Sequence, residues 1–152
     1  MQLRDILKIE AVSIDLESTE KEDVLKELVG LISEDIPDEK KILKILIERE
    51  NLGSTGIGQG IAVPHGKTDN VGQLVAALGI SKKGVDFNSL DGEPVYIFFL
   101  LVAPKTSAGP HLKALARISR ILRDVSFCDI LKKAKDVQTA YNLIIKEDEK
   151  KK

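Results

Sequence analysis

Apolar residues recur every three or four positions in several stretches of the chain, which places them along one face of an α-helix. This pattern predicts helices over residues 21–33, 37–50, 111–122 and 136–145. A shorter helix is expected over residues 128–133. Each of these helices is expected to cover the core with its apolar face.

The predicted helix ends carry residues that are typical of helix ends. Thr19 and Glu22 have the spacing of a capping box, and Asp136 is suited to an N-cap position. Gly53 is a stop signal for the second helix. Residues 147–152 are all charged, so we expect a domain of residues 1–146 followed by a disordered tail.

Runs of apolar residues between the helices predict strands. Val95–Ala103 is β-branched and aromatic throughout, as in a central strand covered on both faces. Shorter strands are expected within Ile9–Leu16, Ile61–His65 and Leu74–Ile80, and a loop over Lys67–Gly72. Helices and strands intermix, so the predicted class is α/β (α+β), a single domain with a mixed parallel and antiparallel sheet flanked by helices.

Composition narrows the function classes. Hydrophobic residues make up 43% of the 152 residues, enough for a packed core, and the formal net charge of −1 gives no basis for binding nucleic acid or an anionic membrane. The longest apolar run has nine residues, far short of the ~20 that a membrane-spanning helix needs. The start of the chain lacks the apolar run of a signal peptide, and Cys128 has no second cysteine to pair with. We therefore expect a cytoplasmic protein with no direct membrane insertion.

The segment Leu52–Lys67 carries the candidate chemistry. It holds four glycines within eight residues, then a short apolar strand, and then Pro64-His65-Gly66. Glycines let a backbone approach a ligand closely, and successive loop N–H groups can bind an anion. The arrangement predicts an accessible, nucleophilic imidazole beside a phosphate-binding loop.

Other chemistries fit this segment less well. Two histidines and one distant cysteine are too few ligands for a metal site. The loop lacks the Walker spacing, and it follows a helix and precedes a strand, the reverse of a dinucleotide-binding motif. Ser54 and Thr55 have no hydrolase motif around them, so they are either loop hydrogen-bonding groups or phosphate contacts.

A histidine nucleophile is better supported. An imidazole with a pKa of about 6.5 is largely neutral at cytosolic pH, and a neutral ring nitrogen can attack phosphorus. Loop N–H groups, an arginine and a second histidine can stabilise the charge of a transferring phosphoryl group. Plainer alternatives stay open: His65 as a packed or surface residue, Arg49 as a cation at a helix end, and His111 as an exposed helix-start residue.

The segment from Leu52 to Gly66, with its Ala-Val-Pro-His65 block, resembles the active-site signature of the fructose/mannitol-type IIA domains of the bacterial phosphoenolpyruvate-dependent sugar phosphotransferase system. Nitrogen-regulatory IIA proteins share this motif and fold. Further similar blocks follow in the same order: Ile47–Glu50, Phe87–Val95, Phe98–Pro104 and His111–Ala116. Two departures are Gln59, where many relatives carry Asn, and Pro110, where an acidic residue is frequent.

The resemblance implies that His65 accepts a phosphoryl group from the carrier HPr and passes it to a IIB component. It also implies that Arg49 stabilises phosphoryl charge and that His111 lies near His65. No metal or organic cofactor is needed. The candidate phosphate contacts are Ser54, Thr55 and Gln59.

Two functions fit this resemblance. The N-terminal third and the block around Asp91 are closer to the sugar-transport members, which favours a phosphoryl carrier for sugar uptake. The alternative is a nitrogen-type regulatory protein whose phosphorylation state controls binding to a target. A degenerate domain without chemistry is disfavoured, because the histidine and the arginine are both present.

Overall fold

The computed structural model describes residues 1–151 of the chain. Five α-helices and two short 3-10 helices are formed within these residues. The α-helices are α1 (Lys21–Leu31), α2 (Glu39–Asn51), α3 (Ala108–Leu122), α4 (Val125–Lys132) and α5 (Val137–Lys150), and the 3-10 helices are η1 (Leu3–Asp5) and η2 (Ser33–Asp35). None of the helices in this described part is long and apolar enough to cross a membrane.

The strands form one mixed sheet, as predicted. They are β1 (Leu7–Ser13), β2 (Gly56–Gly58), β3 (Ile61–Ala62), β4 (His65–Thr68), β5 (Val75–Val85) and β6 (Val95–Pro104). The order is β1-β5-β6-β3-β2, with β4 also paired to β6. β5 and β6 are antiparallel, whereas β1 is parallel to β5, and β3 and β4 are parallel to β6.

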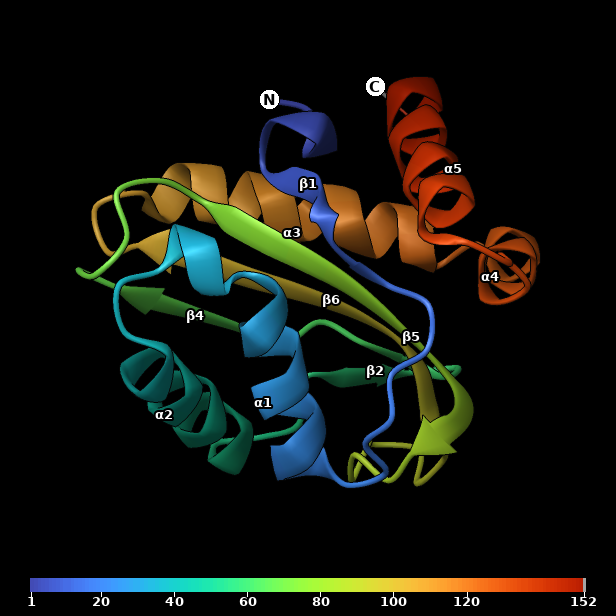
Figure 1. Cartoon of the computed structure of the whole chain (residues 1–152), viewed down its shortest axis with the longest axis horizontal. Coiled ribbons are helices and arrows are strands. Elements are labelled where there is room, and N and C mark those ends of the chain that lie inside the picture. The colour runs from blue at the N-terminus through green and yellow to red at the C-terminus, as the bar shows by residue number, and fades with distance from the viewer. Residues whose placement is uncertain (152) are drawn as a thin grey trace.

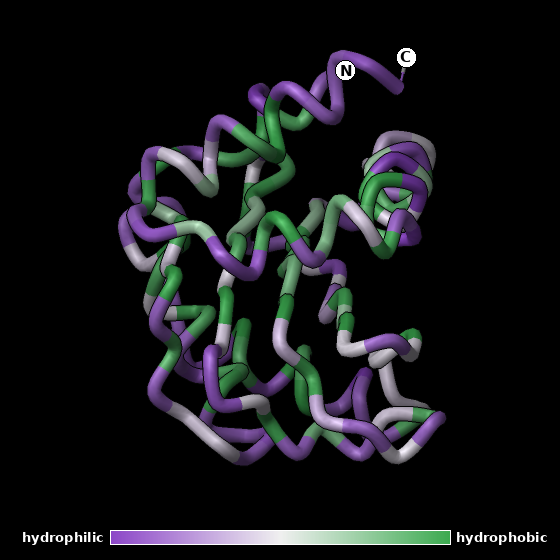
Figure 2. Tube along the Cα trace, turned by 90° about the vertical axis from the view of Figure 1, so that its right-hand side faces the viewer, coloured by the Kyte–Doolittle hydropathy of each residue, from purple (hydrophilic) through white to green (hydrophobic). Residues whose placement is uncertain are grey.

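The predicted central strand is β6. Every residue of β6 except Tyr96 is buried, because helices cover both faces of the sheet. α1 and α2 lie on the near face in Figure 1, and α3 lies behind β5 and β6. Figure 2 shows the same layering as hydrophobic strands in the middle of the molecule with hydrophilic segments toward the outside.

β3 and β4 run one after the other along the same side of β6. β3 pairs with Ile97 and Phe98, and β4 pairs with the segment that begins at Leu101. Pro64 has no N–H and interrupts the strand between them, although its carbonyl still accepts a hydrogen bond from Leu101 N at 2.9 Å. The predicted strand over Ile61–His65 is therefore split, and His65 begins a second strand where a loop from Lys67 was expected.

The glycine-rich segment forms a hairpin rather than the expected open loop beside the histidine. β2 and β3 are antiparallel, and Gln59 and Gly60 make the two-residue turn with φ values of 58° and 80°. A turn with two positive φ angles favours Asn-Gly. Gln59 occupies the first position of this turn, although glutamine adopts the left-handed conformation less readily than asparagine.

Helix ends differ from the sequence prediction in a few places. Asp38 and Asp136 cap α2 and α5 with their side chains, the latter as predicted. The N-cap of α1 is Glu20 and makes no side-chain cap hydrogen bond, so the expected capping box at Thr19 is wrong. α3 begins three residues before His111, because Ala108 to Pro110 already form its first turn.

The charged C-terminus is helical where a frayed tail was expected. α5 continues to Lys150, and the Asp148 side chain is buried with 2% of its surface exposed. One Asp148 oxygen accepts a hydrogen bond from Leu3 N at 2.7 Å, and the other accepts one from Arg117 Nε at 2.9 Å. The run of charges did not predict the last turn of α5, because it gave no sign that the Asp148 carboxylate has two hydrogen-bond partners.

Candidate active site

A pocket of about 740 Å³ opens at the edge of the sheet beside β4. α2 forms one wall and the start of α3 forms the other. The lining residues are Ile45, Glu48, Arg49, Asn51, Leu52, His65, Gly66, Lys67, His111, Leu112 and Leu115. The pocket thus brings together the three residues expected to carry the chemistry, His65, His111 and Arg49.

Close packing of α2 on β4 brings the arginine toward the histidine. Gly66 faces α2, and a Cβ atom at this position would lie 2.8 Å from Ile45 Cγ2. A side chain at this position would require the Ile45 side chain to shift. Arg49 follows Ile45 by one helical turn and lines the same pocket as His65.

The His65 ring has a fixed orientation. Its Nδ1 atom lies 2.8 Å from the carbonyl oxygen of Val63. A carbonyl oxygen only accepts hydrogen bonds, so Nδ1 carries the proton and donates it. In the neutral ring the lone pair is then on Nε2, which is the nitrogen available to react.

The site favours neutral imidazoles. The pKa of His65 is lowered from its ordinary value of 6.5 mainly by burial and further by the positive charges of Arg49 and Lys67, although the hydrogen bond to Val63 and the negative charge of Glu50 raise it. Burial also lowers the pKa of His111, together with the neighbouring His65 and Lys67. Both rings therefore stay uncharged to a lower pH than a solvent-exposed histidine.

His111 lies beside His65. The ring centroids are 5.6 Å apart and the ring planes meet at 68°, an edge-on arrangement. Only 3% of His111 is exposed, so its prediction as an exposed helix-start residue is wrong. Its buried Nδ1 has no hydrogen-bond partner among the described residues, which leaves a polar ring edge unsatisfied beside the pocket.

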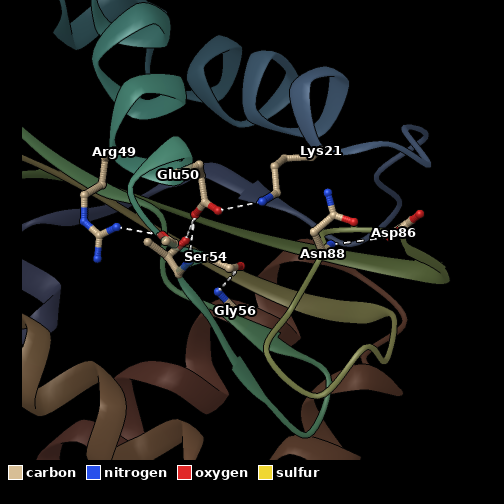
Figure 3. Close-up of polar contacts among 9 residues, drawn as sticks. Lys21, Arg49, Glu50, Ser54, Gly56, Asp86 and Asn88 are labelled. Atoms are coloured by element: carbon tan, nitrogen blue, oxygen red, sulfur yellow. Dashed lines mark hydrogen bonds and ion pairs between the residues drawn. The ribbon is translucent and has the colours of Figure 1, made fainter.

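Arg49 makes a structural contact and also lines the pocket. Its Nη1 donates a hydrogen bond to the carbonyl oxygen of Gly53 at 2.7 Å, which ties the guanidinium to the end of α2 (Figure 3). A guanidinium has five N–H donors, so others are available for a ligand. The helix-end interpretation and the site interpretation are therefore both compatible with its position.

The expected phosphate contacts are not in this pocket. Ser54 Oγ accepts a hydrogen bond from Gly56 N at 3.0 Å, and the Thr55 hydroxyl donates to the Glu50 carboxylate. Gln59 is in the hairpin turn, where its N–H donates to Asp91 Oδ2 at 3.1 Å. None of the three lines the pocket, nor do the glycines of the hairpin.

Three residues of the site were not named from the sequence. Lys67 lies two residues after His65 on β4, so the alternation of a strand places both side chains on the same face. Leu52 is 86% exposed and Leu112 is 67% exposed, and they form an apolar rim. Lys67 could have been found by its spacing if residues 65–68 had been recognised as a strand, whereas the exposure of the two leucines has no sequence signal.

The side chains here do not form a metal site. Within residues 1–151 no group of three or more His, Cys, Asp or Glu residues is placed to hold a metal ion. The pocket offers two imidazoles surrounded by the cations of Arg49 and Lys67, a set suited to an anion.

Comparisons with known proteins agree with this chemistry. The profile of the family described as "Phosphoenolpyruvate-dependent sugar phosphotransferase system, EIIA 2" matches residues 5–147. A nitrogen regulatory protein of Bradyrhizobium diazoefficiens is 36% identical over 145 residues, which is 95% of either chain. The fructose-specific EIIABC component of Bacillus subtilis is 38% identical over 124 residues, 80% of this chain and 20% of that longer one.

A solved structure shows the same arrangement of elements. The nitrogen regulatory protein IIA-Ntr of Neisseria meningitidis superimposes with a TM-score of 0.88 at 29% identity, covering 93% of this chain and 98% of that one. The family profile and the full-length relative cover nearly the whole described fold. The chain belongs to the EIIA 2 family of the phosphoenolpyruvate-dependent sugar phosphotransferase system.

Proposed function

We propose that this chain is a phosphoryl carrier that accepts a phosphoryl group from phospho-HPr on Nε2 of His65. The observation that carries the proposal is the hydrogen bond from His65 Nδ1 to the Val63 carbonyl oxygen, which leaves Nε2 as the unprotonated nitrogen. Family membership supports it, because IIA domains of this system carry phosphoryl groups.

The transfer needs no cofactor. The lone pair of His65 Nε2 attacks phosphorus, and a new N–P bond forms. The N–P bond of the donor histidine breaks, and its electron pair returns to the donor ring. The Nδ1 proton stays between His65 and the Val63 carbonyl, so the positive charge that develops on the ring is met by an acceptor.

Arg49, His111 and Lys67 assist in this proposal. The Arg49 guanidinium can bind two phosphoryl oxygens at once, and the Lys67 ammonium adds a second positive charge from the same face of β4 as His65. His111, whose ring centre lies 5.6 Å from that of His65, supplies a polar ring edge. Phosphoryl transfer depends mainly on positioning and charge stabilisation, and these groups provide both.

The partner surface in this proposal is the apolar rim around the pocket. Leu52 and Leu112 extend into solvent on either side of the histidine. Exposed apolar patches of this kind mark protein-interaction sites. We propose that phospho-HPr and a IIB component use this rim in turn, each bringing its own reactive side chain over His65.

The proposal extends to the acceptor that follows His65. We propose transfer to a IIB component for sugar uptake, which is supported by the similarity to a fructose-specific chain whose name combines A, B and C components. A second candidate is regulation of a target protein by the phosphorylation state. It is supported by the nitrogen regulatory relatives, which match this chain along its full length.

The carrier function is tested by incubating the protein with phosphoenolpyruvate, enzyme I and HPr. We expect the intact protein to gain one acid-labile phosphoryl group, and His65→Ala to gain none. His111→Ala is expected to remain folded and to accept the group more slowly. An unlabelled wild-type protein would contradict the proposal, and an unfolded His111→Ala would make that residue structural.

The acceptor is tested with the labelled protein. Mixing it with membranes that contain a IIB component should discharge the label and produce a sugar phosphate if the transport proposal holds. Retention of the label, together with a target that binds only one of the phosphorylated and free forms, would support the regulatory candidate instead.

A further inference from the structure

A buried carboxylate follows Arg49 at the end of α2. Glu50, in the last turn of α2, has only 5% of its surface exposed, and its Oε2 atom is 2.9 Å from Lys21 Nζ (Figure 3). Lys21 is the first residue of α1, and its ammonium also lies 4.8 Å from the centre of the Phe87 ring. Neither Glu50 nor Lys21 lines the pocket.

The other oxygen of Glu50 holds the chain that leads into the hairpin. Oε1 accepts a hydrogen bond from Thr55 N at 2.9 Å and another from the Thr55 hydroxyl. Thr55 is 4% exposed, so both bonds are shielded from water. The carboxylate therefore fixes the main chain of Thr55 relative to the end of α2.

Two further hydrogen bonds connect Thr55 to the reactive ring. The Thr55 carbonyl oxygen accepts from Val63 N at 3.0 Å. The Val63 carbonyl oxygen, in turn, accepts from His65 Nδ1 at 2.8 Å. A continuous path of contacts thus runs from Lys21 and Glu50 through Thr55 and Val63 to the imidazole.

We propose that Glu50 and Thr55 are positioning residues that set the tautomer and orientation of His65 through the Val63 carbonyl. The inference rests on the carrier function proposed above. A buried ion pair is by itself weak evidence for stability, because desolvation offsets much of its attraction. Here the ion-paired Glu50 binds Thr55, and Thr55 is hydrogen-bonded to Val63, whose carbonyl oxygen accepts the Nδ1 proton of His65.

Loss of this path has a specific consequence. When Val63 is no longer fixed, the His65 ring has no preferred acceptor for its Nδ1 proton. The Nε2–H tautomer, which cannot attack phosphorus through Nε2, then becomes populated. Small misplacements of reacting groups cost on the order of 10- to 100-fold in rate, so we expect losses in that range for variants that break the path.

Glu50→Gln and Thr55→Val test the proposal with small changes of shape. Glu50→Gln presents N–H donors on a side chain that faces both Lys21 and Thr55, and Thr55→Val removes only the hydroxyl. Two quantities are measured: the His65 tautomer, by ring nitrogen NMR at pH 8, and the single-turnover rate of phosphorylation by phospho-HPr. We expect both variants to raise the Nε2–H tautomer and lower the rate, and Thr55→Ser to restore both.

Glu27→Gln is the matched control. Glu27, on α1, accepts hydrogen bonds from the N–H groups of Glu17 and Ser18 and from the Ser18 hydroxyl, so it also holds a loop by a carboxylate. It has no contact path to His65. We expect the His65 tautomer and the phosphorylation rate of Glu27→Gln to match those of the wild type. Circular dichroism verifies that each variant is folded.

The outcomes separate the two proposals. A wild-type tautomer in folded Glu50→Gln and Thr55→Val, with rates equal to that of Glu27→Gln, would overturn the positioning role. Since the NMR measurement needs no phosphoryl donor, it decides this point even if the wild-type protein is never phosphorylated, a result that would refute the carrier function alone.

Discussion

The proton on His65 Nδ1 decides which ring nitrogen can react. It is held by the Val63 carbonyl, two residues earlier, on the far side of Pro64. The histidine was recognisable in the sequence from its Pro-His-Gly context, but its tautomer was not. A backbone carbonyl has no sequence signature, and only the fold shows where it points.

The pH dependence of the His65 ring provides a direct test of its surroundings. In the proposed carrier function the reactive form is the neutral ring, which is lost as the pH falls through the pKa of His65. Because burial, Arg49 and Lys67 place that pKa below 6.5, the ring is expected to be mostly neutral at pH 6.5 and to become protonated only at lower pH. Lys67→Met removes one of the positive charges that lower the pKa of His65, so the midpoint of the His65 titration is expected to move to higher pH.

An NMR titration of the His65 ring measures this midpoint without a phosphoryl donor. Lys83→Met is the control, because it removes the charge of an exposed lysine on β5 that does not line the pocket. A wild-type midpoint at or above 6.5, or an equal midpoint in Lys67→Met, would contradict the electrostatic account of the site.

Individual helices and strands were predictable to the extent that their apolar residues were periodic. The five α-helices and the central strand β6 were found from the sequence, with differences mainly at their ends. The segment expected to be a phosphate-binding loop forms the β2–β3 hairpin, because glycine serves equally well in a tight turn and beside an anion. As a result, Ser54 and Gln59 were expected at the pocket, where the structure does not place them.

α5 provides the prediction for a single helix. Asp148 joins its last turn to Leu3 N and to Arg117 on α3, so Asp148→Ala leaves the Arg117 guanidinium without its carboxylate. The Arg117 side chain is 19% exposed, so solvent screens this pair more than a fully buried one. We therefore expect a loss of about 2–4 kcal/mol in the free energy of unfolding. Urea denaturation measures this loss.

Asp129→Ala is the control for that measurement. Asp129 pairs with Lys132 on the surface of α4, with 58% of its side chain exposed, and we expect a change below about 1 kcal/mol. Equal stability of Asp148→Ala and the wild type would contradict this role of Asp148. It would indicate that residues 147–150 form the frayed tail expected from the run of charges.

The whole molecule assembles its site at one edge of the sheet. β4 contributes His65 and Lys67, the end of α2 contributes Arg49, and the start of α3 contributes His111. These segments are not adjacent in the sequence, and α2 and α3 lie on opposite faces of the sheet (Figure 1). The sequence motif predicted the participants, whereas their meeting point depends on the sheet order and on the close approach of α2 at Gly66.

Identifying the ring nitrogen that becomes phosphorylated tests the account most directly. The protein is phosphorylated with phosphoenolpyruvate, enzyme I and HPr, and phosphorus–nitrogen coupling is measured by NMR. The account predicts phosphorus on Nε2 of His65, with the proton still on Nδ1. Phosphorus on Nδ1 of His65, on His111, or on no residue of the chain would contradict it.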